Sequence, residues 1–163
     1  MVEPYPAGPE QPYQPPSKGS APSTVKQAIT LIWVRVAVGL VSTAFTFLTI
    51  DDLVDDVIAT DASISEDTAR AAIILSAIIG IAFSLGIAVL FVYFIGKGAN
   101  WARIVYTVLT GIGVVVGLFG LLGGQPIVLL LLGLASVVLG IATIVLLFRP
   151  ESNAFFTGQP SRP

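Results

Sequence analysis

The chain has 163 residues, of which 55% are hydrophobic and only 11% are charged, and its formal net charge is -2. Soluble domains average about 25% charged residues, so this composition excludes a soluble globular protein. The chain contains no Cys and no His, which excludes disulfides, thiolate nucleophiles and metal sites built on those ligands. We predict no cofactor, no metal site and no nucleic-acid partner, because the small net charge gives no attraction to phosphate.

The first 24 residues hold most of the eleven prolines and almost no aliphatic side chains. Such a segment cannot bury enough apolar surface to offset the entropy of ordering, so we predict a disordered, Pro-rich cytoplasmic tail. Four of its prolines recur every three residues, the period of polyproline II. That face either docks on an aromatic groove of a partner or belongs to a flexible spacer. The candidate interaction residues of the tail are Pro6, Pro9, Pro12, Pro15, Tyr5 and Tyr13.

Four apolar runs of 22 to 26 residues follow the tail, at 25–50, 71–96, 101–122 and 126–148. Each reaches the roughly 20 residues needed to cross a hydrocarbon core, and a spanning segment must satisfy its backbone hydrogen bonds internally. The sequence therefore predicts an all-α membrane protein, with four transmembrane helices in an antiparallel bundle over 25–148. Residues 149–163 form a short cytoplasmic C-terminal tail in this prediction. Thr24 and Gln27 predict a capping box for the first helix, and Pro150 predicts the end of the fourth.

The basic residues predict the orientation, because short cytoplasmic loops are enriched in Lys and Arg. They lie before the first run, around the second connection and after the last run, at Lys18, Lys26, Lys97, Arg103, Arg149 and Arg162. Only Arg70 lies on the other side. The prediction is a multi-pass protein of the plasma membrane with both termini in the cytoplasm. The Pro-rich tail delays the first apolar run, so we expect an uncleaved anchor rather than a signal peptide.

Two Trp-x-Arg motifs open the first and third runs, at Trp33 with Arg35 and at Trp101 with Arg103. We interpret all four residues as interface anchors, with Arg35 reaching back to the cytoplasmic headgroups. The alternative is an intramembrane anion or proton-relay site at Arg35. The recurrence is also typical of two duplicated helical hairpins, although Trp and Arg are enriched at membrane interfaces without duplication. Both interpretations of the recurrence stay open.

Small residues recur along the second and fourth runs at the spacing that lets two membrane helices approach closely. We predict that both stripes pack inside the bundle. A polar translocation path lined by their hydroxyls is the alternative. The stripe residues are Ala72, Ser76, Gly80, Ser84 and Ala88 in the second run, and Gly133, Ser136 and Gly140 in the fourth.

The outer loop at 51–70 is strongly acidic. Its second half predicts a capping box from Ser63 to Glu66 and an i,i+4 ion pair from Glu66 to Arg70. Its first half carries Asp51, Asp52, Asp55 and Asp56, which would repel one another at the negative end of the first helix if that helix continued through them. We interpret this half as a solvated acidic loop. A divalent cation site is the alternative, and a basic partner is a further source of counter-charge.

Four short segments carry a resemblance to other proteins: Pro4-Tyr5-Pro6, Gln11-Pro12-Tyr13, Gly98-Ala-Asn100-Trp101-Ala-Arg103 and Arg149-Pro150-Glu-Ser152-Asn153-Ala-Phe155-Phe156. With the four apolar runs, they make nearly the whole chain resemble a group of small actinobacterial four-helix membrane proteins with a Pro/Tyr-rich N-terminal tail. The group carries no assigned activity. The resemblance therefore implies an envelope location and this topology, and no mechanism.

The apolar runs contain no Asp or Glu, whereas the small four-helix multidrug transporters couple through a membrane-embedded carboxylate. No nucleophile and base occur together at a plausible depth, so we predict no enzymatic activity. The preferred hypothesis is a non-enzymatic accessory or scaffold protein that packs against a larger membrane complex, or against itself, and presents its tail to a partner. A small oligomeric transporter or channel is the alternative.

Overall fold

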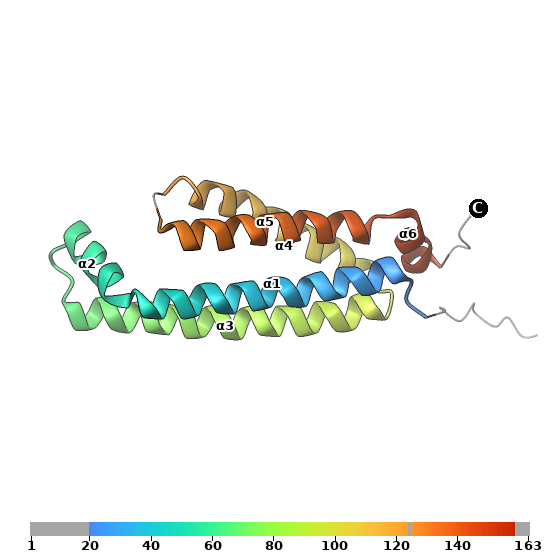
Figure 1. The fold of residues 1–163 in the computed structure, drawn as a ribbon. Helices are drawn as coiled ribbons and strands as arrows, with labels where there is room; N and C mark the ends of the chain where they lie inside the picture. The colour runs from blue at the N-terminus through green and yellow to red at the C-terminus, as the bar shows by residue number, and fades with distance from the viewer. Residues whose placement is uncertain (1–19, 124, 159–163) are drawn as a thin grey trace, which may run out of the picture.

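The computed structural model describes residues 20–123 and 125–158, and this part of the chain folds into six helices and no strands (Figure 1). Four long helices are α1 (Ser23–Leu48), α3 (Glu66–Gly96), α4 (Asn100–Gly120) and α5 (Ile127–Leu147). Each is long and apolar enough to cross a membrane, which confirms the predicted all-helical membrane fold. The short helices are α2 (Ile50–Thr60) and α6 (Pro150–Thr157). The predicted tail residues Pro6, Pro9, Pro12, Pro15, Tyr5 and Tyr13 lie outside the described residues.

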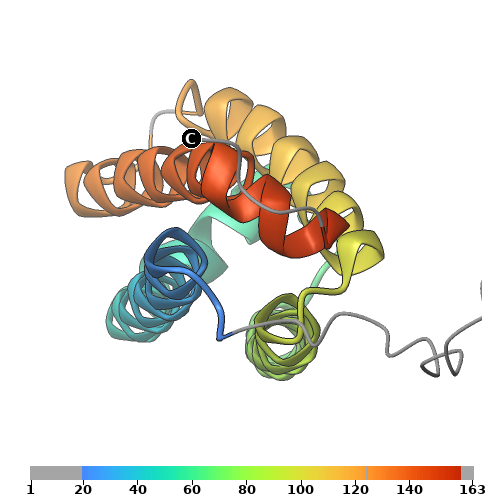
Figure 2. The ribbon, with the colours of Figure 1, turned by 90° about the vertical axis from the view of Figure 1, so that its right-hand side faces the viewer.

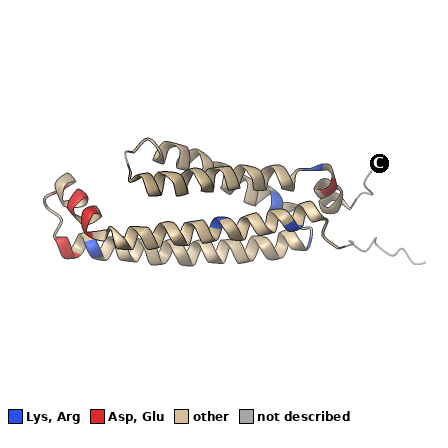
Figure 3. Ribbon diagram, viewed as in Figure 1, with Lys and Arg blue, Asp and Glu red and all other residues tan. Residues whose placement is uncertain are grey.

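The four long helices follow one another around the bundle in the order α3, α1, α5 and α4, as the end view shows (Figure 2). α1 has the most extensive contact with α5 and also packs on α3, while α4 packs on α5. Charges of opposite sign gather at the two ends (Figure 3). We call the end with Lys26, Lys97, Arg103 and Arg149 the basic end, and the end with α2 and the start of α3 the acidic end.

Most of the buried apolar side chains lie at the basic end. Ile95 and Leu147 are fully buried there, at the ends of α3 and α5, and Val25 and Ala28 join them from α1. The turn between α3 and α4 is tight, and Gly98 adopts a positive φ of 71° within it, a conformation that only glycine enters freely. The hydrophobic core of the bundle is therefore most extensive at this end.

The C-terminal segment departs from the prediction of a simple tail. α5 ends at Leu147, and Pro150 then opens α6 at its first turn, where a missing N–H does no harm. Ser152 and Phe156 of α6 are buried against the basic end. The predicted capping box of Thr24 is also wrong, because the Thr24 hydroxyl instead hydrogen-bonds Ser152 at 2.8 Å.

The predicted acidic loop contains a helix of its own. The backbone breaks at Thr49, with φ of -114° and ψ of 26°, and α2 begins directly after it. The break places Asp51 and Asp52 in the first turn of a new helix, where the dipole favours carboxylates. On a continued α1 they would instead lie at the unfavourable end. Val54, three residues after Asp51 on α2, is buried.

Candidate functional site

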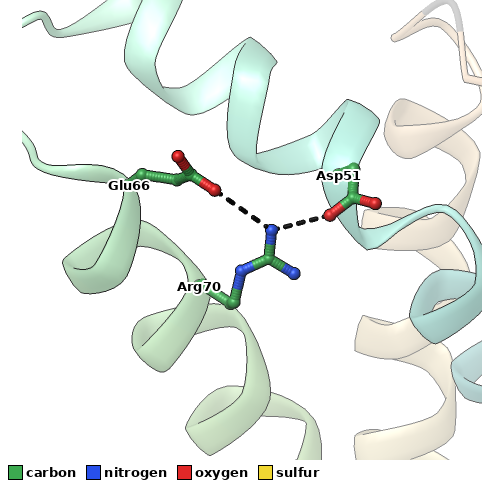
Figure 4. Close-up of polar contacts among 3 residues, drawn as sticks. All are labelled: Asp51, Glu66 and Arg70. Carbon is green, nitrogen blue, oxygen red and sulfur yellow. Dashed lines mark hydrogen bonds and ion pairs between the residues drawn. The ribbon is translucent and has the colours of Figure 1, made fainter.

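The acidic end is organised by Arg70, which joins α2 to α3 (Figure 4). Its Nη2 lies 2.6 Å from Asp51 Oδ1 and 3.3 Å from Glu66 Oε1. The predicted Glu66 to Arg70 pair is therefore present. The predicted Ser63 cap is wrong, because Ser65 caps α3 by accepting a hydrogen bond from the Thr68 N–H.

The remaining acidic side chains of this end do not gather into a metal site. Asp52, Asp55 and Asp56 are exposed on α2. Asp61 accepts hydrogen bonds from the main-chain N and Oγ of Ser63, which lower the pKa of its carboxyl. Within residues 20–123 and 125–158, no three carboxylates converge where they could hold a metal ion.

The two small-residue stripes have different surroundings. On α5, a Cβ at Gly133 would lie 3.1 Å from Leu121 Cδ2, and one at Gly140 would lie 3.2 Å from Thr110 Cγ2. This stripe does pack inside the bundle. Of the stripe residues on α3, Ala88 is buried, whereas Ala72, Ser76, Gly80 and Ser84 are exposed. The prediction that the α3 stripe packs inside the bundle is wrong at these four positions, because α3 contacts α1, α2 and α4 while these residues stay exposed.

The exposed α3 stripe borders a groove of about 210 Å³ between α1 and α3. Gly39 and Thr43 line the groove from α1, and Gly80 and Ser84 line it from α3. A Cβ at Gly39 or at Gly80 would meet nothing within 4 Å. We call this feature the α1–α3 groove. Val36, Leu40, Ile81 and Leu85 complete the lining, so the glycine on each side is the place where another backbone can approach closely.

Arg103 is a buried clamp rather than an interface anchor. It is 6% exposed, and its Nη1 donates to Asn153 Oδ1 at 2.5 Å and to the Leu147 carbonyl at 3.4 Å. Its guanidinium also lies over the rings of Phe148 and Phe156, with Cζ 4.6 and 4.7 Å from their centroids. The predicted headgroup role of Arg103 is therefore wrong, because the side chain ties α4 to α5 and α6.

Trp101, the other member of this motif, is half exposed and packs on Phe94 with ring centroids 5.0 Å apart. Trp33 on α1 is similarly exposed. Their roles as interface anchors, and the duplication of the two hairpins, stay predictions.

Arg35 has the opposite environment to Arg103. Its half-buried side chain turns into the bundle, where a Cβ added at Gly113 would lie 3.4 Å from its Nη2 and one added at Gly140 would lie 3.6 Å from its Cζ. Gly140 lies seven residues inside the end of α5, so the guanidinium reaches toward the interior of the bundle. The predicted role of Arg35 as an interface anchor stays a prediction. Gly113 and Gly140 carry no side chain, which leaves the space that the Arg35 guanidinium occupies. Arg35 makes no hydrogen bond, ion pair or cation–π contact with any described residue.

Arg35 lines a cavity of about 470 Å³ between the four long helices, which is within the usual range of small-molecule sites. The walls are largely apolar, with Ile32 and Val36 from α1, Phe83 and Ile87 from α3, and Leu109 from α4. Four hydroxyls also line it, from Ser84, Tyr106, Thr110 and Ser136. We call this feature the central cavity.

None of the four cavity hydroxyls makes a hydrogen bond within the part of the chain that the structure describes. Tyr106 is 5% exposed and Thr110 is 4% exposed. By contrast, the other Ser and Thr side chains of the four long helices are hydrogen-bonded, apart from Ser23 at the first residue of α1. Thr143, for example, donates to the Leu139 carbonyl at 2.7 Å. The unbonded hydroxyls of the described long helices, apart from that of Ser23, therefore line one cavity. Among the described residues, the buried side-chain nitrogen that has no hydrogen-bond partner, Nε of Arg103, lies outside it.

Tyr106 and Thr110 were not among the site residues predicted from the sequence. Arg103, Tyr106 and Thr110 recur three and four residues apart, with Gly113 next in the series, so they share one face of α4. This polar stripe on an otherwise apolar run was the available signal. Comparisons with protein-family models, with curated proteins and with solved structures give no match for this chain. The resemblance to small actinobacterial membrane proteins therefore stays a prediction.

Proposed function

We propose that this integral membrane protein is a non-enzymatic accessory protein that binds another membrane-spanning protein through the α1–α3 groove. The observation that carries the proposal is the open space at Gly80. In lipid, helices associate by close packing rather than by a hydrophobic driving force, and small residues permit that packing. On α5 the small residues pack inside the molecule, whereas a Cβ at Gly39 or Gly80 in the α1–α3 groove would meet no atom of the described chain within 4 Å.

The orientation belongs to the same proposal. The basic end faces the cytoplasm, because Lys26, Lys97 and Arg149 gather there and cytoplasmic ends of membrane proteins are enriched in such residues. The N-terminal tail then extends toward a cytoplasmic partner. Cysteine introduced at Ala62 should react with an impermeant thiol reagent in intact cells, and cysteine at Ser20 should not. Labelling at Ser20 but not at Ala62 would reverse the orientation.

The accessory role is tested by purifying the tagged full chain from its native membrane in mild detergent. We expect a stoichiometric partner with the wild type and with Gly86→Leu, and loss of that partner with Gly80→Leu. Both glycines lie on α3 with nothing within 4 Å of an added Cβ, and only Gly80 lines the groove. The two variants should keep the same thermal stability when isolated. Retention of the partner by Gly80→Leu would exclude the groove as the contact.

The central cavity favours a second candidate, a small oligomeric transporter, because one cation and four hydroxyls line a space within the span. The same purification separates the two functions. A wild-type chain that leaves the membrane only as a homo-oligomer, with no other protein, would favour the transporter.

A further inference from the structure

We infer that the central cavity binds an amphiphilic anion, with its carboxylate or phosphate on Arg35 and its hydrocarbon chain against the apolar walls. This site adjoins the proposed protein contact, because Val36, Gly39 and Ser84 line both the cavity and the α1–α3 groove. The ligand-binding groups Arg35, Tyr106, Thr110 and Ser136 line only the cavity, so the two proposals can be tested with different variants.

The charge of Arg35 defines the head of the ligand. Charged residues within a membrane span pair with an opposite charge or with backbone carbonyls, and Arg35 pairs with neither among the described residues. The next acidic residue along the chain, Asp51, is sixteen positions away, or about 24 Å along a helix, and it already pairs with Arg70. A planar guanidinium binds carboxylate and phosphate oxygens in a bidentate manner. The missing counter-charge is therefore an oxyanion.

Thr110 lies beside this guanidinium. Its Cγ2 is 3.2 Å, and the Arg35 Cζ 3.6 Å, from the same point, the Cβ position of Gly140. Ser136 is one helical turn from Gly140 on α5, and Tyr106 is one turn from Thr110 on α4. Their hydroxyl oxygens have no partner among the described residues, and none of them is among the fully buried unpartnered atoms, so they can donate to a molecule in the cavity. A bound oxyanion offers several acceptor positions to these hydroxyls as well as to Arg35.

The walls define the rest of the ligand. Ile32, Phe83, Ile87 and Leu109 offer no polar partner, so a small hydrated anion would lose its water there without replacement. A hydrocarbon chain fits such walls. Arg35 is the one charged residue in the lining, and it balances a head group that carries a single negative charge. Two kinds of membrane component combine these properties, a long-chain carboxylate and an anionic phospholipid.

The test uses the delipidated full chain in dodecyl maltoside and two probes, spin-labelled stearate and spin-labelled phosphatidylglycerol. A bound probe gives an immobilised component in its electron paramagnetic resonance spectrum. We expect at least one probe to be immobilised saturably at one per chain, and the probe that binds more tightly identifies the source. Oleate or unlabelled phosphatidylglycerol should displace it, while oleyl alcohol and inorganic phosphate should not.

Arg35→Met should weaken binding about tenfold or more, since a hydrogen bond to a charged group is lost. Arg149→Met removes the same charge from an exposed position at the basic end and should leave binding unchanged. Thr110→Val should weaken binding a few-fold without loss of stability, because its hydroxyl has no partner in the described chain. Thr143→Val is its control, since that buried hydroxyl already bonds its own helix.

Should Arg35→Met fail to fold, the pair of threonine variants still decides the question. Immobilisation of neither probe would overturn the inference, as would displacement by oleyl alcohol as effective as by oleate. Wild-type affinity in the Thr110→Val variant, or in a folded Arg35→Met variant, would also overturn it.

Discussion

The two Trp-x-Arg motifs have the same sequence pattern and opposite surroundings. Arg103 is buried and is held by Asn153, the Leu147 carbonyl and two phenylalanine rings. Arg35 faces the central cavity and contacts no polar partner among the described residues. The difference shows that a basic residue near the start of a membrane helix can serve as an internal clamp or remain available for a ligand. The side chains that other helices place around the basic residue determine which of these two roles it has.

The largest effect is expected for Arg103→Met, which removes the clamp. A hydrogen bond to a charged group contributes about 1.5 to 3 kcal/mol, and a cation–π contact adds about 0.5 to 1 kcal/mol. We therefore expect a loss of about 3 kcal/mol in the free energy of unfolding, measured by denaturation in detergent micelles. α6 should also become sensitive to protease. Wild-type protection of α6 in this variant would contradict the clamp.

Gly140→Ala tests the space that Arg35 occupies. The new Cβ would lie 3.2 Å from both Thr110 Cγ2 and Val114 Cγ2, and 3.6 Å from Arg35 Cζ. Such overpacking is expected to lower the free energy of unfolding by about 1 kcal/mol. Gly86→Ala, at a position with open space around it, should be neutral or slightly stabilising. Equal thermal midpoints for the two variants would show that Arg35 and Thr110 do not pack against Gly140.

Ser152→Ala tests the second attachment of α6. The Ser152 hydroxyl is buried, bonds Thr24 at 2.8 Å and also donates to the Leu146 carbonyl. Its removal should lower the free energy of unfolding by about 1 kcal/mol, less than the loss of Arg103. A larger effect of Ser152→Ala than of Arg103→Met in the same denaturation assay would assign the main attachment of α6 to Ser152.

The smallest effect is expected at the acidic end. Asp51 and Arg70 form an exposed pair, and exposed pairs contribute about 0 to 1 kcal/mol. Asp51→Asn should therefore lower the thermal midpoint slightly, and moderate salt should abolish the difference. A salt-independent loss as large as that of Arg103→Met would mean that α2 supports the bundle, contrary to this account.

The spans could be predicted from the sequence because the length of an apolar run and the thickness of a membrane constrain each other. The helix α2 could not be predicted from the sequence. On a continuous first helix, Asp51, Asp52, Asp55 and Asp56 would repel one another at its negative end, and the sequence pattern does not show that the helix breaks. The backbone break at Thr49 reverses the sign of the dipole interaction, and no turn residue marks it.

The packing of the small-residue stripes was predictable only in part. Spacing identifies the face of a helix that permits close approach, and it says nothing about which helix occupies that face. Gly140 meets α4, whereas a Cβ at Gly80 would meet no atom of the described chain within 4 Å. Arg103 and Asn153 are fifty residues apart, so the clamp depends on a long-range contact that local patterns do not report.

The unfolding of Arg35→Met, in the delipidated full chain, tests the contrast between the two arginines most directly. Because Arg35 has no partner in the described structure, replacing its charge by an apolar side chain of similar length removes an unpaired charge from a membrane-spanning helix and breaks no bond. We expect the thermal midpoint to stay the same or rise, opposite in sign to the change in Arg103→Met. A fall as large as that of Arg103→Met would contradict the account, because it would mean that Arg35 is itself a clamp.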